Sequence, residues 1–529
     1  MKNTIKRLMC IMLTLIMLLS VLVACKRKNK GDEQPSDSAG SNDVVDSGNG
    51  TQADEYDENG YLMDKVGKQD FGGKEIRILG WTQRSYGEVG MKYEEISKST
   101  VGQEVYNRDM KVQARLNVKI KAVLEPGDNS TYKNGYIPKA ETMVAGNEVD
   151  GFAGYSMSAT PLMVRGYLTD LTKQPYIDLN APWWSADLIE RATIYDRLYF
   201  ATGSIAPSFL AQGFAMFFNK SMADIYLKDA LAVHNAETLY DMVDNKSWTI
   251  DNFITLAKNV EITGSTKTEN ETYGYVCQII AYDPWYFSAG LITLDNAADG
   301  SVQVSDDWSS AKAIELTEKL LTFFNSRSAG AAVHIGKIEY TYAAAWTQGK
   351  SLFTTATISS LPSWAQKATV ADSGIGVLPM PMWESTQESY KSTAGFYFTI
   401  WSIARNSDRQ EELAAVMECL ASEGYRLTEP ALYDETLKIK STGGDGGEDD
   451  RRMIDIVRDS IVIDAGRIHN NDISGLGWGM FRNSLMEDIV SNSSSSTYAS
   501  YFSTRSTNLA GKIKTLNDTV YAIESIYGG

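Results

Sequence analysis

The chain has 529 residues, of which 50 are Lys or Arg and 67 are Asp or Glu, so its net charge is −17. A protein this acidic repels phosphate backbones, which argues against binding to nucleic acid. Its three histidines and four cysteines leave little material for metal or nucleophile chemistry. At roughly 150 residues per domain, the length predicts two to four domains.

The N-terminus has the pattern of a secretion signal. Three basic residues precede an apolar run from Leu8 to Ala24, which is typical of a cleaved signal peptide. The run ends in Leu22-Val23-Ala24-Cys25, which resembles the bacterial lipobox. We therefore expect residues 1–24 to be removed and Cys25 to be lipidated, with palmitate among its acyl chains. The alternative is an uncleaved anchor helix.

A tether is predicted for residues 25–70. The basic stretch 26–30 would lie near anionic headgroups, and the following Gly, Ser, Asp and Asn residues bury too little apolar surface to fold. No later stretch approaches the length of a membrane span. We expect the folded part on the extracellular face of the cell membrane, held there by lipid alone. Residues 25–529 carry 47 basic and 67 acidic side chains, a net charge of −20.

Strand and helix patterns alternate in the first part of the folded body. The spacing predicts strands at 74–81, 117–124 and 149–155, and helices at 98–116 and 137–146. Such alternation favours a parallel sheet covered by helices. Ligands on these sheets bind at the carboxyl ends of strands, so Trp81 and Tyr155 are expected near a site.

The second part of the body continues the mixed pattern, and no internal repeat is visible. Strands are predicted at 198–203, 213–219, 375–378 and 396–400, and helices at 250–260, 309–324, 410–421 and 453–457. Thr249 is placed to cap the helix that begins at Ile250.

Motifs for catalysis or cofactor binding are absent from the sequence. Gly349-Lys350-Ser351 resembles the end of a phosphate-binding loop, but Ala344 stands where that motif requires glycine. The acidic loop 445–450 lacks the ligand spacing of a calcium loop. His234, His334 and His469 stand alone. We predict no catalytic residue, no metal and no cofactor, although a structural metal at the acidic loop is left open.

Two cysteines remain once Cys10 is removed and Cys25 is acylated. Cys277 and Cys419 could form a disulfide outside the cell, and their spacing does not decide whether they pair. Cys419 shares an apolar helical stripe with neighbouring residues, which favours a buried free thiol.

The eleven tryptophans are more informative. Several occupy predicted loops, and indole faces stack on the C–H faces of sugar rings. Asp283 lies two residues before Trp285, which places a carboxylate beside aromatic faces. Ser359–Trp364 offers hydroxyl groups and an indole on a Pro-bent turn.

Five stretches in order resemble the sugar-binding family of ABC-importer solute-binding proteins, which includes maltose-binding protein. They are Asp150–Leu171, Phe217–Lys220, Ser247–Phe253, Trp346–Lys350 and Gly376–Pro381. The resemblance covers nearly all of residues 71–525. It also accounts for the incomplete phosphate-loop motif.

The resemblance implies an α/β fold of the type II periplasmic-binding-protein kind, with two lobes that close about a hinge of crossing strands. The first lobe would comprise 71–206 and 396–430, and the second 207–395 and 431–529. The crossings are expected near 205–212, 394–397 and 428–432.

The family pattern also suggests site residues. Trp285, Trp364 and Trp478 fall where stacking aromatics occur, although the turn at Trp364 lacks the family's glycine. Tyr155 and Ser156 fall near polar residues after the third strand, where the usual acidic ligand is not evident. The candidate ligand-binding residues are Trp81, Tyr155, Ser156, Asp283, Trp285, Trp364, Tyr397 and Trp478.

We therefore expect a monomeric, lipid-anchored receptor that passes a carbohydrate, in particular an oligosaccharide, to an ABC permease without enzymatic activity. One alternative is a secreted carbohydrate-active lipoprotein that uses two carboxylates. Another is a surface interaction lipoprotein without a small ligand.

Overall fold

The computed structural model describes residues 55–82, 88, 99–260, 271–325, 331–333, 344–365, 368–440, 448–469 and 498–527. The predicted signal peptide, Cys25, most of the tether, His334 and Trp478 lie outside these ranges. None of the helices in these ranges combines the length and hydropathy that a membrane crossing requires.

The first sheet has the strand order β12-β3-β1-β2. Its strands are β1 (Lys74–Trp81), β2 (Val118–Glu125), β3 (Gly151–Tyr155) and β12 (Thr399–Ile403). β1 pairs in parallel with β2 and β3, whereas β12 runs antiparallel to β3. The predicted parallel sheet is thus correct for three strands and wrong for the fourth. β12 also begins three residues later than predicted, because Phe398 N–H bonds to Phe396 C=O in a tight turn.

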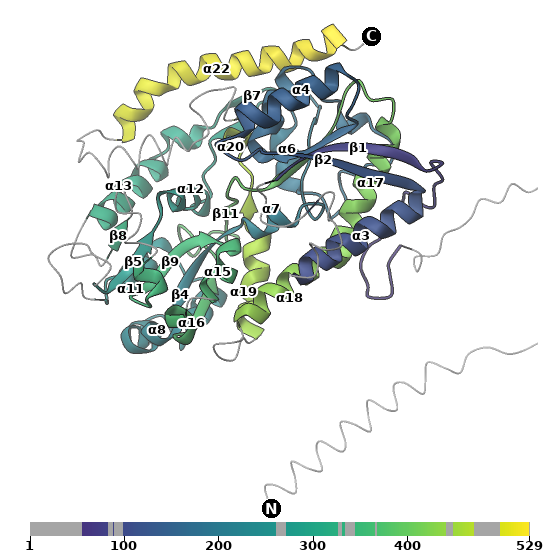
Figure 1. Ribbon diagram of the computed structural model, residues 1–529. Helices are drawn as coiled ribbons and strands as arrows, with labels where there is room; N and C mark the ends of the chain where they lie inside the picture. Colours follow the sequence, from purple (N-terminus) through teal and green to yellow (C-terminus); the bar gives the residue numbers. More distant parts are fainter. Residues whose placement is uncertain are drawn as a thin grey trace, which may run out of the picture. The chain divides into compact units, whose positions relative to one another are not determined.

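Helices cover both faces of this sheet. In Figure 1, α4 (Ile137–Ala145) lies on one side, and α3 (Thr100–Leu116) and α17 (Gln410–Glu423) lie on the other. α3 begins where Ser99 Oγ accepts a hydrogen bond from Gly102 N–H, and it ends at Asn117, which has a φ of 47°. The predicted helices 98–116, 137–146 and 410–421 are therefore confirmed with small changes at their ends.

The second sheet has the order β10-β4-β9-β5-β8. Its strands are β4 (Phe214–Asn219), β5 (Tyr273–Cys277), β8 (Ala331–Val333), β9 (Ser351–Thr357) and β10 (Ile375–Leu378). β4 and β10 match the predictions, but β5, β8 and β9 were not predicted. β5 and β9 are almost wholly buried, so their sequences lack the alternation that marks a half-exposed strand.

Eight helices of the described residues, most of them short, lie around the second sheet. They are α8 (Lys220–Tyr226), α9 (Lys228–Ala232), α10 (Leu239–Asp244), α11 (Ile250–Ala257), α12 (Asp283–Ser288), α13 (Ala311–Asn325), α15 (Leu361–Ala365) and α16 (Ala368–Asp372). Thr249 caps α11 as predicted, because its side chain accepts a hydrogen bond from Asn252 N–H.

Three segments connect the two sheets near the predicted crossings. The first contains α7 (Pro207–Ala211), the second is residues 394–398, and the third leads into α18 (Glu429–Lys440). Gly395 N–H donates to Gln212 C=O at 2.8 Å, which ties the first two together. α19 (Glu448–Asp459) and the β11–β13 pair (Ser392–Thr393 and Ile461–Val462) lie beside them. Whether the two halves move as separate lobes with the predicted boundaries stays a prediction.

The predicted strand at 198–203 is wrong. Ala201 makes one isolated bridge to Trp401, and Gly203 makes another to Trp184. Gly203 has a φ of 151°, and a Cβ there would lie 2.2 Å from Trp183 O. The close approach of these two backbones therefore requires glycine and interrupts the strand.

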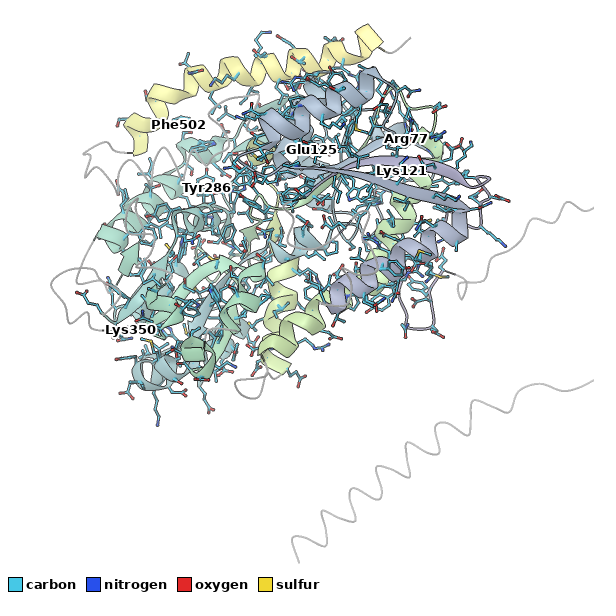
Figure 2. The ribbon with its side chains drawn as sticks, viewed as in Figure 1. Arg77, Lys121, Glu125, Tyr286, Lys350 and Phe502 are labelled. Carbon is cyan, nitrogen blue, oxygen red and sulfur yellow. The ribbon has the colours of Figure 1, made fainter. Side chains whose placement is uncertain are left out.

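A C-terminal helix, α22 (Tyr498–Tyr527), was not predicted. It contacts α5 (Ala159–Val164), α13 and β7 (Val302–Val304), which pairs with β6 (Leu294–Asn296). The Asn517 side chain hydrogen-bonds both N–H and C=O of Val302. Phe502 and Tyr286, labelled in Figure 2, both pack against the Trp308 ring, at centroid distances of 6.4 and 5.5 Å.

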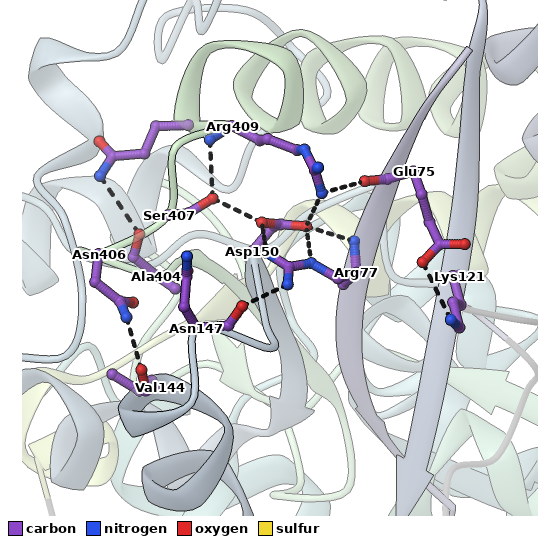
Figure 3. Close-up of polar contacts among 11 residues, drawn as sticks. Glu75, Arg77, Lys121, Val144, Asn147, Asp150, Ala404, Asn406, Ser407 and Arg409 are labelled. Carbon is purple, nitrogen blue, oxygen red and sulfur yellow. Dashed lines mark hydrogen bonds and ion pairs between the residues drawn. The ribbon is translucent and has the colours of Figure 1, made fainter.

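Asp150, from the first family-like motif, has a structural role. Its carboxylate accepts hydrogen bonds from the Arg77 backbone, the Arg77 guanidinium and Ser407 Oγ, and Arg409 lies 3.7 Å away (Figure 3). Burial raises the pKa of Asp150, but these hydrogen bonds outweigh it and the pKa lies below its usual value. This network joins β1 to the turn that follows β12.

Candidate functional site

An aromatic cluster occupies the carboxyl ends of β1 and β3. The ring centroids of Trp81 and Tyr155 lie 5.1 Å apart, and Tyr397 lies 5.5 Å from Tyr155 and 6.3 Å from Trp81. Tyr132, which was not predicted, packs 5.6 Å from Tyr155. The expectation that the two strand ends bring Trp81 and Tyr155 together is confirmed. Below, "aromatic cluster" means these four residues.

Tyr397 is the accessible member of the aromatic cluster. It is 38% exposed, whereas Trp81 and Tyr155 are fully buried. Burial, followed by the neighbouring Tyr397 and Tyr132, raises the pKa of Tyr155 well above its usual value. The Tyr155 hydroxyl therefore stays neutral and remains a hydrogen-bond donor. The arrangement presents one accessible aromatic ring packed on three buried ones.

A buried carboxylate, Glu88, is linked to the aromatic cluster through Thr399. Trp81 Nε1 donates to Thr399 Oγ1 at 2.9 Å, and that hydroxyl donates to Glu88. The other Glu88 oxygen accepts from Ser208 N–H at 2.8 Å, at the start of α7. Glu88 thus joins the first sheet to a predicted crossing segment. The surrounding sequence shows no apolar periodicity, so no local signal could have identified it.

A second group of polar side chains lies beside residues 394–398. Ser156 Oγ donates to Phe396 C=O at 2.6 Å. The Arg467 guanidinium lies 4.2 Å from the centre of the Phe396 ring, donates to Ala394 C=O at 2.7 Å and forms an ion pair with Asp283. Two predicted site residues, Ser156 and Asp283, are therefore linked through Phe396 and Arg467, which were not predicted.

The Asp283–Arg467 pair is almost completely buried, with side-chain exposures of 1% and 7%. Arg467 comes from the four-residue helix α20 (Ala465–Ile468). Its charge also lowers the pKa of Tyr155 against the larger effect of burial, so it lies within electrostatic reach of the aromatic cluster. Within this pair, the two charges compensate each other.

Trp285 and Trp364 lie elsewhere in the structure. Trp285 is fully buried in the core of the second sheet, 5.0 Å from Phe253 and 6.0 Å from Tyr275. Trp364 packs edge-on against Phe217 at 5.0 Å and is 7% exposed. Within the described residues, no ring contact joins either indole to the aromatic cluster. Both have core contacts in this conformation, and their ligand role stays a prediction, as does that of Trp478, which lies outside the described ranges.

Cys277, Cys419 and His469 are the remaining candidates for chemistry, and all three are buried in the protein interior. Cys277 and Cys419 are both buried free thiols, which confirms the expectation for Cys419; burial raises the pKa of Cys277 to about 12. His469 is fully buried beside Thr160 Oγ1, and burial lowers its pKa to about 4. Among the described residues, no group of three or more His, Cys, Asp or Glu could hold a metal ion.

Comparisons with known proteins give the fold. No family model and no curated protein matches the chain. The galacto-N-biose-/lacto-N-biose I-binding protein of the ABC transporter from Bifidobacterium longum, solved with lacto-N-biose, has a TM-score of 0.51 at 14% identity, covering 85% of this chain and 99% of that one. A cyclo/maltodextrin-binding protein complexed with maltotetraose has a TM-score of 0.54 at 11% identity, covering 84% and 99%.

A sugar transporter protein from Rhizobium etli, in an open conformation, has a TM-score of 0.52 at 16% identity, covering 85% of this chain and 99% of that one. The chain therefore has the two-lobe α/β fold of periplasmic binding proteins. The resemblance seen in the sequence is confirmed at the level of the fold.

Proposed function

We propose that this protein is the extracellular receptor of an ABC importer and that it binds a neutral oligosaccharide. The observation that carries the proposal is the aromatic cluster, with Tyr397 half-exposed, beside the charge-compensated Asp283–Arg467 pair. The fold adds support, since proteins that share it were solved with lacto-N-biose and with maltotetraose.

The chemistry of these residues suits a sugar. An aromatic ring offers its face to the C–H groups of a pyranose, and buried polar side chains fix the hydroxyl groups. Asp283 and Arg467 provide an acceptor and donors without leaving a net charge for the ligand to neutralise. A charged ligand would lack a counter-charge among these residues.

Delivery would follow from closure of the two lobes about the crossings, with the lipid on Cys25 keeping the monomeric receptor beside its permease. The Glu88 network supports this role, because it couples Trp81 of the aromatic cluster to α7. In a hinge motion, a few residues absorb the change in backbone angles. The side chains within each lobe then need to move little when the lobes close on a ligand.

The test is a panel of neutral oligosaccharides scored by thermal shift and by tryptophan fluorescence. A ligand that binds only the folded state at 100 times its Kd adds about 2.7 kcal/mol to the free energy of unfolding. Tyr397→Ala should weaken binding of the active sugar at least about tenfold, from the lost stacking. Tyr521→Ala is the matched control, since Tyr521 is 66% exposed on α22. The proposal fails if no sugar raises the melting temperature, or if both variants bind alike.

A further inference from the structure

A cavity lies apart from the aromatic cluster. Its volume is about 510 Å³, within the size range of small-molecule sites. It shares no lining residue with the aromatic cluster or the Asp283–Arg467 pair. Its walls include Trp184, Asp187, Phe209, Lys391, Glu429 and Arg458.

The cavity is built from segments that meet at the crossings. Phe209 belongs to α7, Glu429 begins α18, and Arg458 lies near the end of α19. Lys391 directly precedes β11, which pairs with β13. In Figure 1, α7, α18 and α19 lie next to one another, in agreement with their contacts. Several elements far apart in the sequence therefore enclose one space.

Lys391 contributes an uncompensated positive charge to this space. Its side chain is partly buried, and no carboxylate of the described residues lies within 4.0 Å of its ammonium group. Arg458 differs, because Asp459 lies 2.7 Å, Asp455 3.4 Å and Glu429 3.7 Å from its guanidinium nitrogens. The ammonium group is thus left for an anion from outside the chain.

Two carboxylates in the same walls are under-compensated. Asp187 accepts a hydrogen bond from Ile463 N–H, but its nearest cation, Arg191, lies 3.7 Å away. Glu429 accepts from Ser204 Oγ at 2.7 Å, and its cation Arg458, 3.7 Å away, lies closer to Asp455 and Asp459. Burial raises the pKa of both carboxyl groups, since these partners do not offset the loss of water. Each carboxylate therefore favours a cationic partner.

We propose that this cavity is a second ligand site, which takes a small zwitterion such as an α-amino acid or a dipeptide. The ligand's carboxylate binds Lys391, its ammonium group binds Asp187 or Glu429, and its body packs on Trp184 and Phe209. A simple anion adds no cation to the two under-compensated carboxylates, and a neutral sugar offers no opposite charge to any of the three groups. Only a molecule with both charges compensates both signs at once.

Calorimetry on the purified protein tests the proposal with standard L-amino acids and dialanine. At least one zwitterion should bind saturably with a Kd below about 1 mM. Its N-acetylated form, which lacks the cation, and its amide, which lacks the anion, should each bind at least about tenfold more weakly. Absence of saturable binding by every zwitterion, or equal binding of the blocked forms, overturns the proposal.

Variants locate the binding. Lys391→Met removes the ammonium group and keeps the apolar stem, so it should weaken zwitterion binding at least about tenfold. Asp187→Asn keeps an acceptor for Ile463 and Glu429→Gln keeps one for Ser204, and at least one of the two should have a similar effect. Lys119→Met, at an exposed position of β2, is the control. If Lys391→Met binds as tightly as Lys119→Met, with both folded by circular dichroism, the cavity is not the site.

Discussion

Replacement of Arg467 by methionine probes the buried ion pair that links the two parts of the candidate site. The substitution keeps an apolar stem against Phe396 but removes the charge beside Asp283 and the hydrogen bond to Ala394 C=O. Because the Asp283 side chain is 1% exposed, its carboxylate cannot regain water. Breaking a buried pair in this way costs about 3–5 kcal/mol, and we expect the free energy of unfolding to fall by that amount.

Urea denaturation followed by fluorescence and circular dichroism measures the change, provided that the two transitions coincide. Arg451→Met is the control, since Arg451 is 64% exposed and makes a surface pair that is worth at most about 1 kcal/mol. Adding Asp283→Asn to Arg467→Met should cost less than the sum of the single changes, because no buried charge is then left. The reasoning is refuted if Arg467→Met costs no more than Arg451→Met.

Three further predictions concern other parts of the chain. Burial raises the pKa of Glu418 to about 8. Over the pH range from about 4.5 to 8 the folded state therefore holds an extra proton, and the free energy of unfolding falls as the pH rises. Melting curves of Glu418→Gln should lack this fall, and an unchanged pH dependence contradicts the assignment. Trp364→Ala should lower the free energy of unfolding by about 3–5 kcal/mol in urea, from its packing on Phe217; a cost below about 1 kcal/mol argues against a core role. Cys25→Ser should move the protein from the membrane fraction to the medium, and retention in the membrane contradicts lipid anchoring.

The strand ends of the candidate site could be predicted because they follow from local patterns. Parallel strands place their carboxyl ends at one edge of a sheet, so Trp81 and Tyr155 were expected together, and they are in contact. The antiparallel β12 could not be predicted in this way. Its direction depends on a partner more than 240 residues away in the chain, β3, and a local pattern carries no information about that pairing.

Arg467 and Glu88 were missed for a related reason. Each is a charged residue in a short or irregular segment, and its importance comes from a distant partner, Asp283 or Thr399. Trp285 and Trp364 show a different limit of local reasoning, and their ligand role stays a prediction. A tryptophan one or two residues after a proline has the same sequence pattern in a core as at a ligand site, and only the surrounding packing separates the two.

The C-terminal helix α22 has a practical consequence for measuring motion in this protein. It contacts α5, from the range of the first predicted lobe, and α13, from the range of the second. A rotation of one half against the other must therefore change the packing of α22 on at least one of them. A fluorophore at the exposed position 521, far in the sequence from the residues proposed to touch sugar, should report opening and closing without occupying the ligand site.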